Sequence, residues 1–143
     1  MLNSVALFLS LLQVNTNKEM YVSSDLRPHV EAFKEAYELS CGGTLEFPEY
    51  YKIETATDLY KNRAGVCVRL PGMFLIKIDR DGWEHSDQHE KMQVMFHELS
   101  HCLLKEDHSK NSSNYMYYKM NDLVDEEVVR QTFVVMRRHC SND

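Results

Sequence analysis

The feature that most constrains this 143-residue chain is the run His97-Glu98-Leu99-Ser100-His101. Two histidines four positions apart lie on one face of an α-helix, about one turn apart along its axis. That spacing lets both imidazoles reach a single Zn²⁺ at the roughly 2.0–2.1 Å that Zn–N bonds require. Glu98 lies about 100° around the helix from His97, so its carboxylate can contact a water at the metal without being a ligand. The pattern predicts a helix that carries two metal ligands and the general base of a metal-assisted hydrolysis.

A catalytic zinc site normally has a third protein ligand, and the next histidine along the chain is His108. On a continuous helix, His108 would share the face of the first two histidines but stand roughly 10 Å beyond His101 along the axis. One ion cannot bridge that gap. We therefore expect the helix to end between Leu103 and Asp107, and the chain to turn back so that His108 becomes the third ligand.

The stretch from His97 to Tyr118 resembles the metzincin clan of zinc metalloproteases, in which HExxHxxGxxH precedes a turn that contains a methionine. The Asp-His-Ser at 107–109 is similar to the end of the zinc motif in matrixin-type enzymes. The run Asn-Tyr-Met-Tyr-Tyr at 114–118 resembles the Met-turn, which implies that Met116 forms the floor beneath the metal. Tyr118 matches a tyrosine near the zinc of astacin-like members, which implies a role in steadying the oxyanion. Overall the chain looks closest to short metallopeptidases of bacteria and their phages that carry HELxHC and then an Asp-His pair.

Two departures from the metzincin pattern concern the turn after the helix. Six residues, rather than five, separate His101 from His108, and Leu104 stands where the family has a glycine. The glycine lets the backbone turn with a positive φ. We therefore expect a residue from Lys105 to Asp107 to adopt that conformation in its place.

There is a rival third ligand, because gluzincins use a glutamate on a later helix in place of the third histidine. Glu126 and Glu127 lie on such a predicted helix. Acidic residues are also favoured in a first helical turn by the helix dipole, and Asn121 or Asp122 can cap this helix. We keep His108 as the predicted ligand and the two glutamates as the alternative.

The rest of the chain predicts a single α+β domain over residues 21–143 that is zincin-like, and more closely metzincin-like. Its expected order is an N-terminal helix, a small twisted sheet, the zinc-binding helix, the Met-turn and a C-terminal helix. Capping residues, β-branched residues and turn signals set the boundaries. The expected elements are a helix from Ser24 or Asp25 to Gly42-Gly43, strands over 50–57, 65–70 and 73–79, a turn at Asp81-Gly82, the zinc helix over 87–104 and a last helix over 122–139.

Residues 1–20 form a separate apolar segment. The run 4–12 has the length of a signal-peptide core and is too short to span a bilayer. It lacks a positively charged start and a small-residue cleavage site, so we favour a retained arm that packs on the domain or on a protein partner. We accordingly expect a soluble protein, cytoplasmic or virion-associated rather than secreted.

Four cysteines form no CxxC pair, which argues against a cysteine-rich structural zinc site. Cys102 follows His101 on the predicted zinc helix, and we expect it to pack inward as a small hydrophobic residue. A disulfide between Cys41 and Cys140, each at the end of a predicted helix, is compatible with the sequence but cannot be deduced from it.

The net charge of −6 and the lack of a Lys/Arg cluster argue against nucleic-acid binding. The sequence predicts an endopeptidase with one Zn²⁺ per chain, a peptide or protein substrate, and Glu98 as general base. The alternative is a non-catalytic, zinc-stapled binding or assembly module, for instance a phage structural component. Glu98 separates the two, because a structural site does not need an acid beside an open coordination position.

Overall fold

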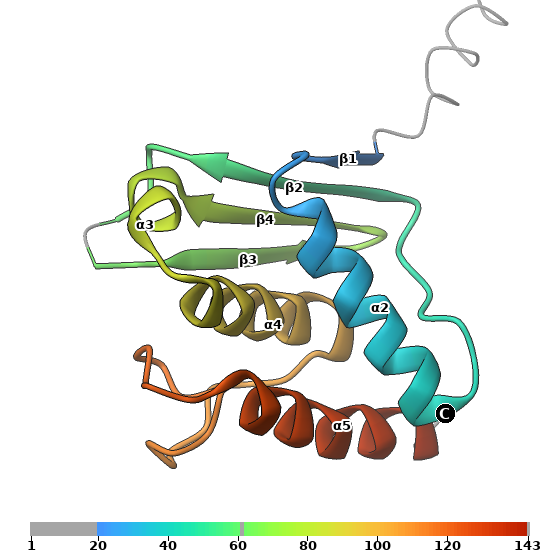
Figure 1. The fold of residues 1–143 in the computed structure, drawn as a ribbon. Coiled ribbons are helices and arrows are strands. Elements are labelled where there is room, and N and C mark those ends of the chain that lie inside the picture. The colour runs from blue at the N-terminus through green and yellow to red at the C-terminus, as the bar shows by residue number, and fades with distance from the viewer. Residues whose placement is uncertain (1–19, 61, 143) are drawn as a thin grey trace, which may run out of the picture.

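The described part of the chain, residues 20–60 and 62–142 of a computed structural model, forms a four-stranded sheet and four helices (Figure 1). The prediction of a small single α+β domain is confirmed at this level, whereas the apolar run 4–12 lies outside the described residues. None of the described helices combines the length and apolar composition needed to cross a membrane. In chain order the elements are β1 (Met20–Val22), α2 (Arg27–Cys41), β2 (Tyr50–Ala56), β3 (Gly65–Leu70), β4 (Met73–Asp79), α3 (Arg80–His85), α4 (Gln88–Leu104) and α5 (Asp125–Ser141).

The sheet has the strand order β1-β2-β4-β3, which puts β3 at an edge. β1 pairs with β2 and β2 with β4 in parallel, whereas β3 pairs antiparallel with β4. The turn between β3 and β4 contains Gly72, whose φ of 74° belongs to the left-handed region that glycine tolerates. Both strands of this hairpin keep the predicted boundaries, 65–70 and 73–79.

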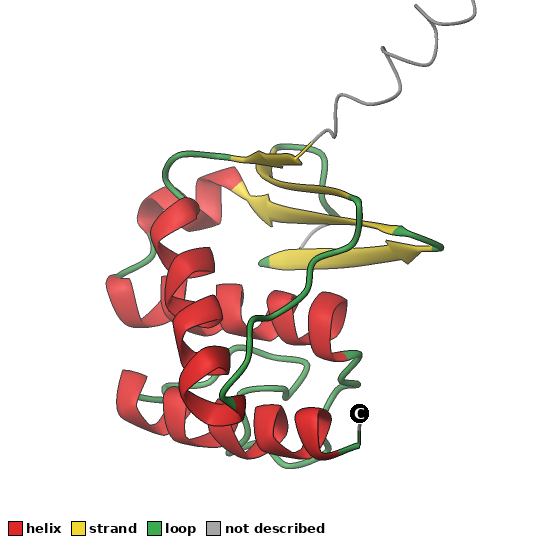
Figure 2. Cartoon of the chain, turned by 90° about the vertical axis from the view of Figure 1, so that its right-hand side faces the viewer, coloured by secondary structure: helices red, strands yellow, loops and turns green. Residues whose placement is uncertain are grey.

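The long helices α2, α4 and α5 all lie on one side of the sheet (Figures 1 and 2). α4 packs against β3 and β4, α5 packs on the far side of α4, and α2 contacts both of these helices. Phe74, Ile76 and Ile78 alternate along β4 and are buried, as expected for a strand with one covered face. α4 is thus the middle layer. Buried residues, most of them apolar, occupy several faces of α4 because the sheet covers one side of it and α5 the other.

α4 begins and ends close to the predicted boundaries, for local reasons. Asp87 accepts a hydrogen bond from the backbone N–H of Glu90, and the Glu90 side chain accepts one from the N–H of Asp87, which is a capping box. At the other end Leu104 is the last helical residue, and Lys105 adopts the left-handed conformation with φ 57° and ψ 32°. The prediction that a residue from 105 to 107 replaces the missing glycine is confirmed.

One predicted turn and one unpredicted strand are the main errors of the sequence analysis. Asp81-Gly82 lies inside α3 and not in a turn, because Asp79 accepts a 2.8 Å hydrogen bond from the N–H of Gly82 and caps a short helix there. β1 was not expected, since a three-residue strand carries little pattern of its own and forms through its pairing with β2.

The starts of two helices also differ from the prediction. The N-cap of α2 is Leu26 rather than Ser24 or Asp25, and that of α5 is Val124 rather than Asn121 or Asp122. Neither cap residue makes a side-chain hydrogen bond. The expected capping side chain of Asn121 is engaged elsewhere, where it holds the loop before α5.

The four cysteines pair as Cys41–Cys140 and Cys67–Cys102. The first disulfide joins the ends of α2 and α5, as the sequence allowed. The second joins edge strand β3 to α4 at the residue after His101. Cys102 is buried as predicted, and it also forms a disulfide, which the sequence analysis left open. The pairing could not be found from spacing, because a β-strand and a later helix contribute one cysteine each.

Lys105→Gly should raise the free energy of unfolding by about 0.5–1 kcal/mol. The left-handed conformation costs a residue with a Cβ roughly 1–2 kcal/mol, and glycine avoids this cost. Part of the gain is offset because glycine loses more conformational entropy on folding. Urea denaturation followed by circular dichroism measures the change. Lys110→Gly, in the following loop at a residue without positive φ, is the matched control and should be neutral or destabilising. A Lys105→Gly variant less stable than the original chain would contradict the role of this cap.

Candidate metal centre

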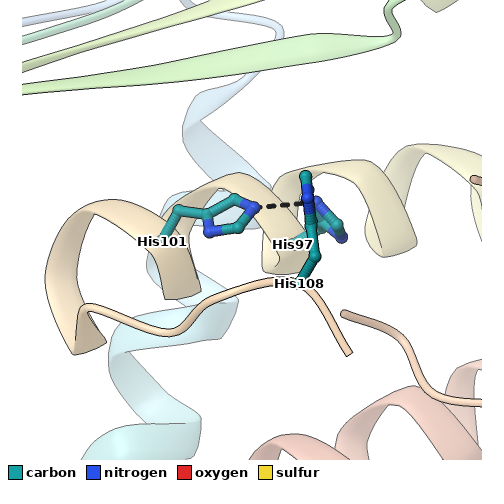
Figure 3. A group of neighbouring side chains, drawn as sticks. All are labelled: His97, His101 and His108. Atoms are coloured by element: carbon teal, nitrogen blue, oxygen red, sulfur yellow. Dashed lines mark hydrogen bonds between the residues drawn. The ribbon is translucent and has the colours of Figure 1, made fainter. Parts of the chain in front are cut away.

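Three histidines come together at the end of α4 (Figure 3). His97 and His101 project from successive turns of α4, and His108 comes from the loop that turns back after Lys105. One nitrogen from each ring can be chosen so that all three lie within 4.8 Å of one another. The structure therefore brings together the three residues that the sequence analysis proposed as metal ligands.

Hydrogen bonds to the backbone set the tautomer of the two helical imidazoles. The Nδ1 of His97 lies 2.9 Å from the carbonyl oxygen of Tyr115, and the Nδ1 of His101 lies 2.5 Å from that of Glu106. A carbonyl oxygen can only accept a hydrogen bond, so each Nδ1 must carry the proton. In the neutral rings, Nε2 then has a free lone pair and can bind a metal.

These two Nε2 atoms lie 3.0 Å apart, as the dashed line in Figure 3 marks. Two lone pairs cannot form a hydrogen bond, and a bond between them would need one ring protonated at both nitrogens. Burial lowers the pKa of His97 to about 4 and also lowers the pKa of His101, so the neutral forms dominate near pH 7. A cation between the nitrogens satisfies both lone pairs. The donor set therefore fits a metal ion that binds imidazole.

Glu98 is a buried carboxylate beside this centre. Glu98 is on α4 and is 6% exposed. Burial raises the pKa of its carboxyl group to about 7, although the positive charge of Arg63 acts to lower it. Gly65, the first residue of β3, makes room for it. A Cβ at Gly65 would lie 2.9 Å from the Cγ of Glu98 and 3.1 Å from its Oε1. The edge strand can thus approach the carboxylate closely because residue 65 has no side chain.

The three histidines and Glu98 share one cleft of about 1040 Å³. One wall is formed by β3 and the residues before it, and the opposite wall by the segment 117–120. Tyr118 belongs to this second wall and is 59% exposed. The structure therefore brings all the predicted catalytic and metal-ligating residues into the same cavity.

A comparison with known protein families gives the context for this arrangement. Residues 48–132, more than half of the chain, match the model of a family described as putative phage metallopeptidase. The chain belongs to this family. The match spans β2 to the middle of α5 and includes the three histidines and Glu98. Comparisons with curated proteins and with solved structures found no match.

In this member of the phage metallopeptidase family, the segment that resembles a Met-turn packs against the histidines. Met116 is 2% exposed, and its carbonyl oxygen accepts a 2.8 Å hydrogen bond from the N–H of Ser109, next to His108. Tyr115, the residue before it, supplies the carbonyl for His97 and also forms a 2.9 Å bond from its hydroxyl to that of Ser100. The segment thus contacts His97 directly and the backbone of the residue next to His108.

Glu126 and Glu127, the alternative third ligands, do not belong to the histidine group. Glu127 forms an ion pair with Arg130 at 2.6 Å and accepts a hydrogen bond from Gln131 at 2.7 Å, and Glu126 is exposed on α5. Among the described residues, the group that can hold a metal contains His97, His101 and His108 and neither glutamate.

Two features of the cleft and its histidines escaped the sequence analysis. The carbonyl groups of Tyr115 and Glu106 are backbone atoms, for which the side-chain pattern gives no signal. Arg63 and Arg69 line the cleft, but nothing near them in the sequence indicates this. Gly65 carried a usable signal, because glycine at the start of a strand often marks close backbone approach.

In the metal-free protein, Glu98→Gln should increase stability at pH 8. The pKa of Glu98 is about 7 when folded and near 4.5 when unfolded, so the folded state binds the extra proton between these values. Stability of the original chain therefore falls as pH rises from about 4.5 to 7, by roughly 2–3 kcal/mol. The glutamine variant lacks this loss.

Urea denaturation in a chelator at pH 4.5 and pH 8 measures this effect. The variant and the original chain should differ little at the lower pH and most at the higher one. Glu126→Gln is the control for removing an exposed carboxylate. A difference that is the same at both pH values would show that Glu98 does not change its protonation on folding.

Proposed function

We propose that this chain is a zinc-dependent endopeptidase of the zincin type, closest to the metzincins. His97, His101 and His108 would hold one Zn²⁺ per chain. The observation that carries the proposal is the pair of Nε2 atoms 3.0 Å apart, both with free lone pairs, beside the buried carboxylate of Glu98. Tetrahedral zinc with Zn–N bonds of roughly 2.0–2.1 Å places neighbouring nitrogens about 3.3 Å apart, close to this separation.

Glu98 would act as the general base. Zinc, when bound, makes water acidic and polarises the carbonyl of the scissile bond. Glu98 takes the proton from the attacking water and then donates it to the nitrogen of the leaving amine. Burial raises the pKa of Glu98 to about 7 in the metal-free chain, and a bound Zn²⁺ beside it would lower that pKa, so the carboxylate would be ionised near neutral pH and able to accept the proton.

The substrate would lie along β3 as an extended strand. β3 pairs with β4 on one side, and its other edge has no strand partner among the described residues. Residues of β3 also line the cleft, so a peptide paired to this edge would pass over the histidines and Glu98. Hydrogen bonds to the backbone would then hold the scissile bond in place.

Tyr118 and Met116 would take the roles implied by the metzincin resemblance. Tyr118 is exposed in the cleft, where its hydroxyl can steady the oxyanion. Met116 would pack beneath the metal without binding it, since a thioether is a soft ligand and poorly matched to a histidine-rich zinc site.

The metal assignment predicts one zinc per chain by elemental analysis. His97→Ala and His101→Ala should lose stoichiometric zinc. His108→Ala should weaken zinc affinity by more than roughly 100-fold, beyond the 10–100-fold that loss of a ligand-orienting residue costs. Glu126→Ala and Glu127→Ala are matched controls on α5 and should retain zinc. Retention of full affinity by His108→Ala together with loss in a glutamate variant would favour the gluzincin ligand set.

The catalytic assignment predicts that Glu98→Gln binds zinc and folds, yet cleaves peptides about 10²-fold or more slowly. The measurement is cleavage of a broad peptide library followed by mass spectrometry, with zinc content determined on the same samples. Glu126→Gln serves as the control for the charge change. An original chain that binds one zinc and cleaves no peptide would replace the enzyme proposal with the zinc-stapled binding module.

A further inference from the structure

Three cationic side chains line the cleft of a chain whose net charge is −6. They are Arg63, Arg69 and Lys119. Of the described residues that line the same cleft, Glu98 is the one with a carboxylate. A cleft lined by one sign of charge focuses the field and attracts ligands of the opposite sign.

The two arginines of the cleft differ from the other arginines of the chain. Within the described residues, neither Arg63 nor Arg69 has a carboxylate or a hydrogen-bond acceptor for its guanidinium group. Four of the other five have an oxygen acceptor or a carboxylate, whereas Arg137 has only the contact of an aromatic ring in this part of the chain. These partners are the Val22 carbonyl for Arg27, Thr55 for Arg80, Glu127 for Arg130, the Phe133 ring for Arg137, and Glu106 for Arg138.

The two arginines lie toward opposite ends of the edge strand. Arg63 precedes β3 by two residues and lowers the pKa of Glu98 by its charge, whereas Arg69 is near the end of β3 and lowers the pKa of His101. They are six positions apart, which corresponds to at most roughly 20 Å of extended chain. A peptide paired with β3 would span the same length with about six residues.

We propose that the cleft selects peptides with acidic side chains on both sides of the scissile bond, bound by Arg63 at one end of β3 and Arg69 at the other. A guanidinium group binds a carboxylate through two parallel hydrogen bonds, so each arginine suits an aspartate or a glutamate. This proposal rests on the proposed peptidase function and names its substrate class.

The opposite wall supports the same selection. The ammonium of Lys119 lies 5.4 Å from the centre of the Tyr118 ring, and both residues line the cleft. The charge of Asp107 raises the pKa of His101, but this carboxylate does not line the cleft. Negative charge on the substrate would therefore meet cations along both walls.

The test begins with a random eight-residue peptide library, in which mass spectrometry identifies a cleaved core. Matched peptides then carry Glu, Gln or Lys three residues to either side of the scissile bond. With the zinc-loaded chain, kcat/KM should be at least roughly tenfold higher for Glu than for Gln peptides, and lowest for Lys peptides. The preference should shrink in 0.5 M salt, which screens exposed charges.

Variants assign the preference to residues. Arg63→Gln and Arg69→Gln should each reduce the Glu-over-Gln ratio on one side of the scissile bond, and the double variant should bring it within about twofold of unity. Arg137→Gln, the same charge change on α5 away from the cleft, should keep the original ratio. An unchanged ratio in the double variant would overturn the proposal.

Peptide binding separates this proposal from the peptidase function itself. Fluorescence anisotropy gives the Kd of labelled Glu and Gln peptides for zinc-loaded Glu98→Gln. Cleavage without any preference for charge would overturn the acidic selection and leave the peptidase proposal intact. Tighter binding of Glu peptides that the double arginine variant abolishes, in a chain that cleaves nothing, would support the selection and overturn the peptidase proposal. If the chain shows no cleavage and no charge-dependent binding, both proposals are overturned.

Discussion

The metal centre depends on one long-range hydrogen bond, from His97 Nδ1 to the carbonyl of Tyr115, eighteen residues later. It fixes the tautomer that leaves Nε2 free, and it requires the loop before α5 to lie against α4. Two side-chain amides hold that loop. Asn121 donates hydrogen bonds to the carbonyls of Ser112 and Asn114. Gln131 accepts one from the N–H of Tyr115 and donates one to the carbonyl of Ser113. Because Gln131 is on α5, the last helix contributes to the orientation of the His97 imidazole on α4.

Stability and function oppose each other at this site. A buried carboxylate and two facing lone pairs destabilise the metal-free fold, and in the proposed function the same features would bind a cation and transfer a proton. The surrounding core compensates, since α4 is packed between the sheet and α5. Gly65 makes the burial of Glu98 possible, because a side chain at residue 65 would occupy the space of the Glu98 carboxylate.

Local signals made much of this fold predictable. The gap between His101 and His108 placed the end of α4, and the Pro71-Gly72 turn signal separated the two strands of the hairpin. Features that depend on distant partners escaped. β1 exists through its pairing with β2, the Cys67–Cys102 bridge joins elements that no spacing relates, and the arginines of the cleft are brought to it by the path of β3. The histidines could be proposed as a set from their spacing, whereas the carbonyls that orient them could not.

The Cys67–Cys102 disulfide makes one wall of the cleft conditional on its surroundings. Strand β3 pairs with β4, packs against α4, and is joined covalently by this bridge to α4, which carries His101. The ladder forms wherever the chain folds. In a reducing cytosol, however, glutathione and thioredoxin keep cysteine thiols reduced, whereas disulfides form in oxidising compartments. A chain made in a cell and released from it would therefore gain a covalent link between this wall and the helix of the histidines.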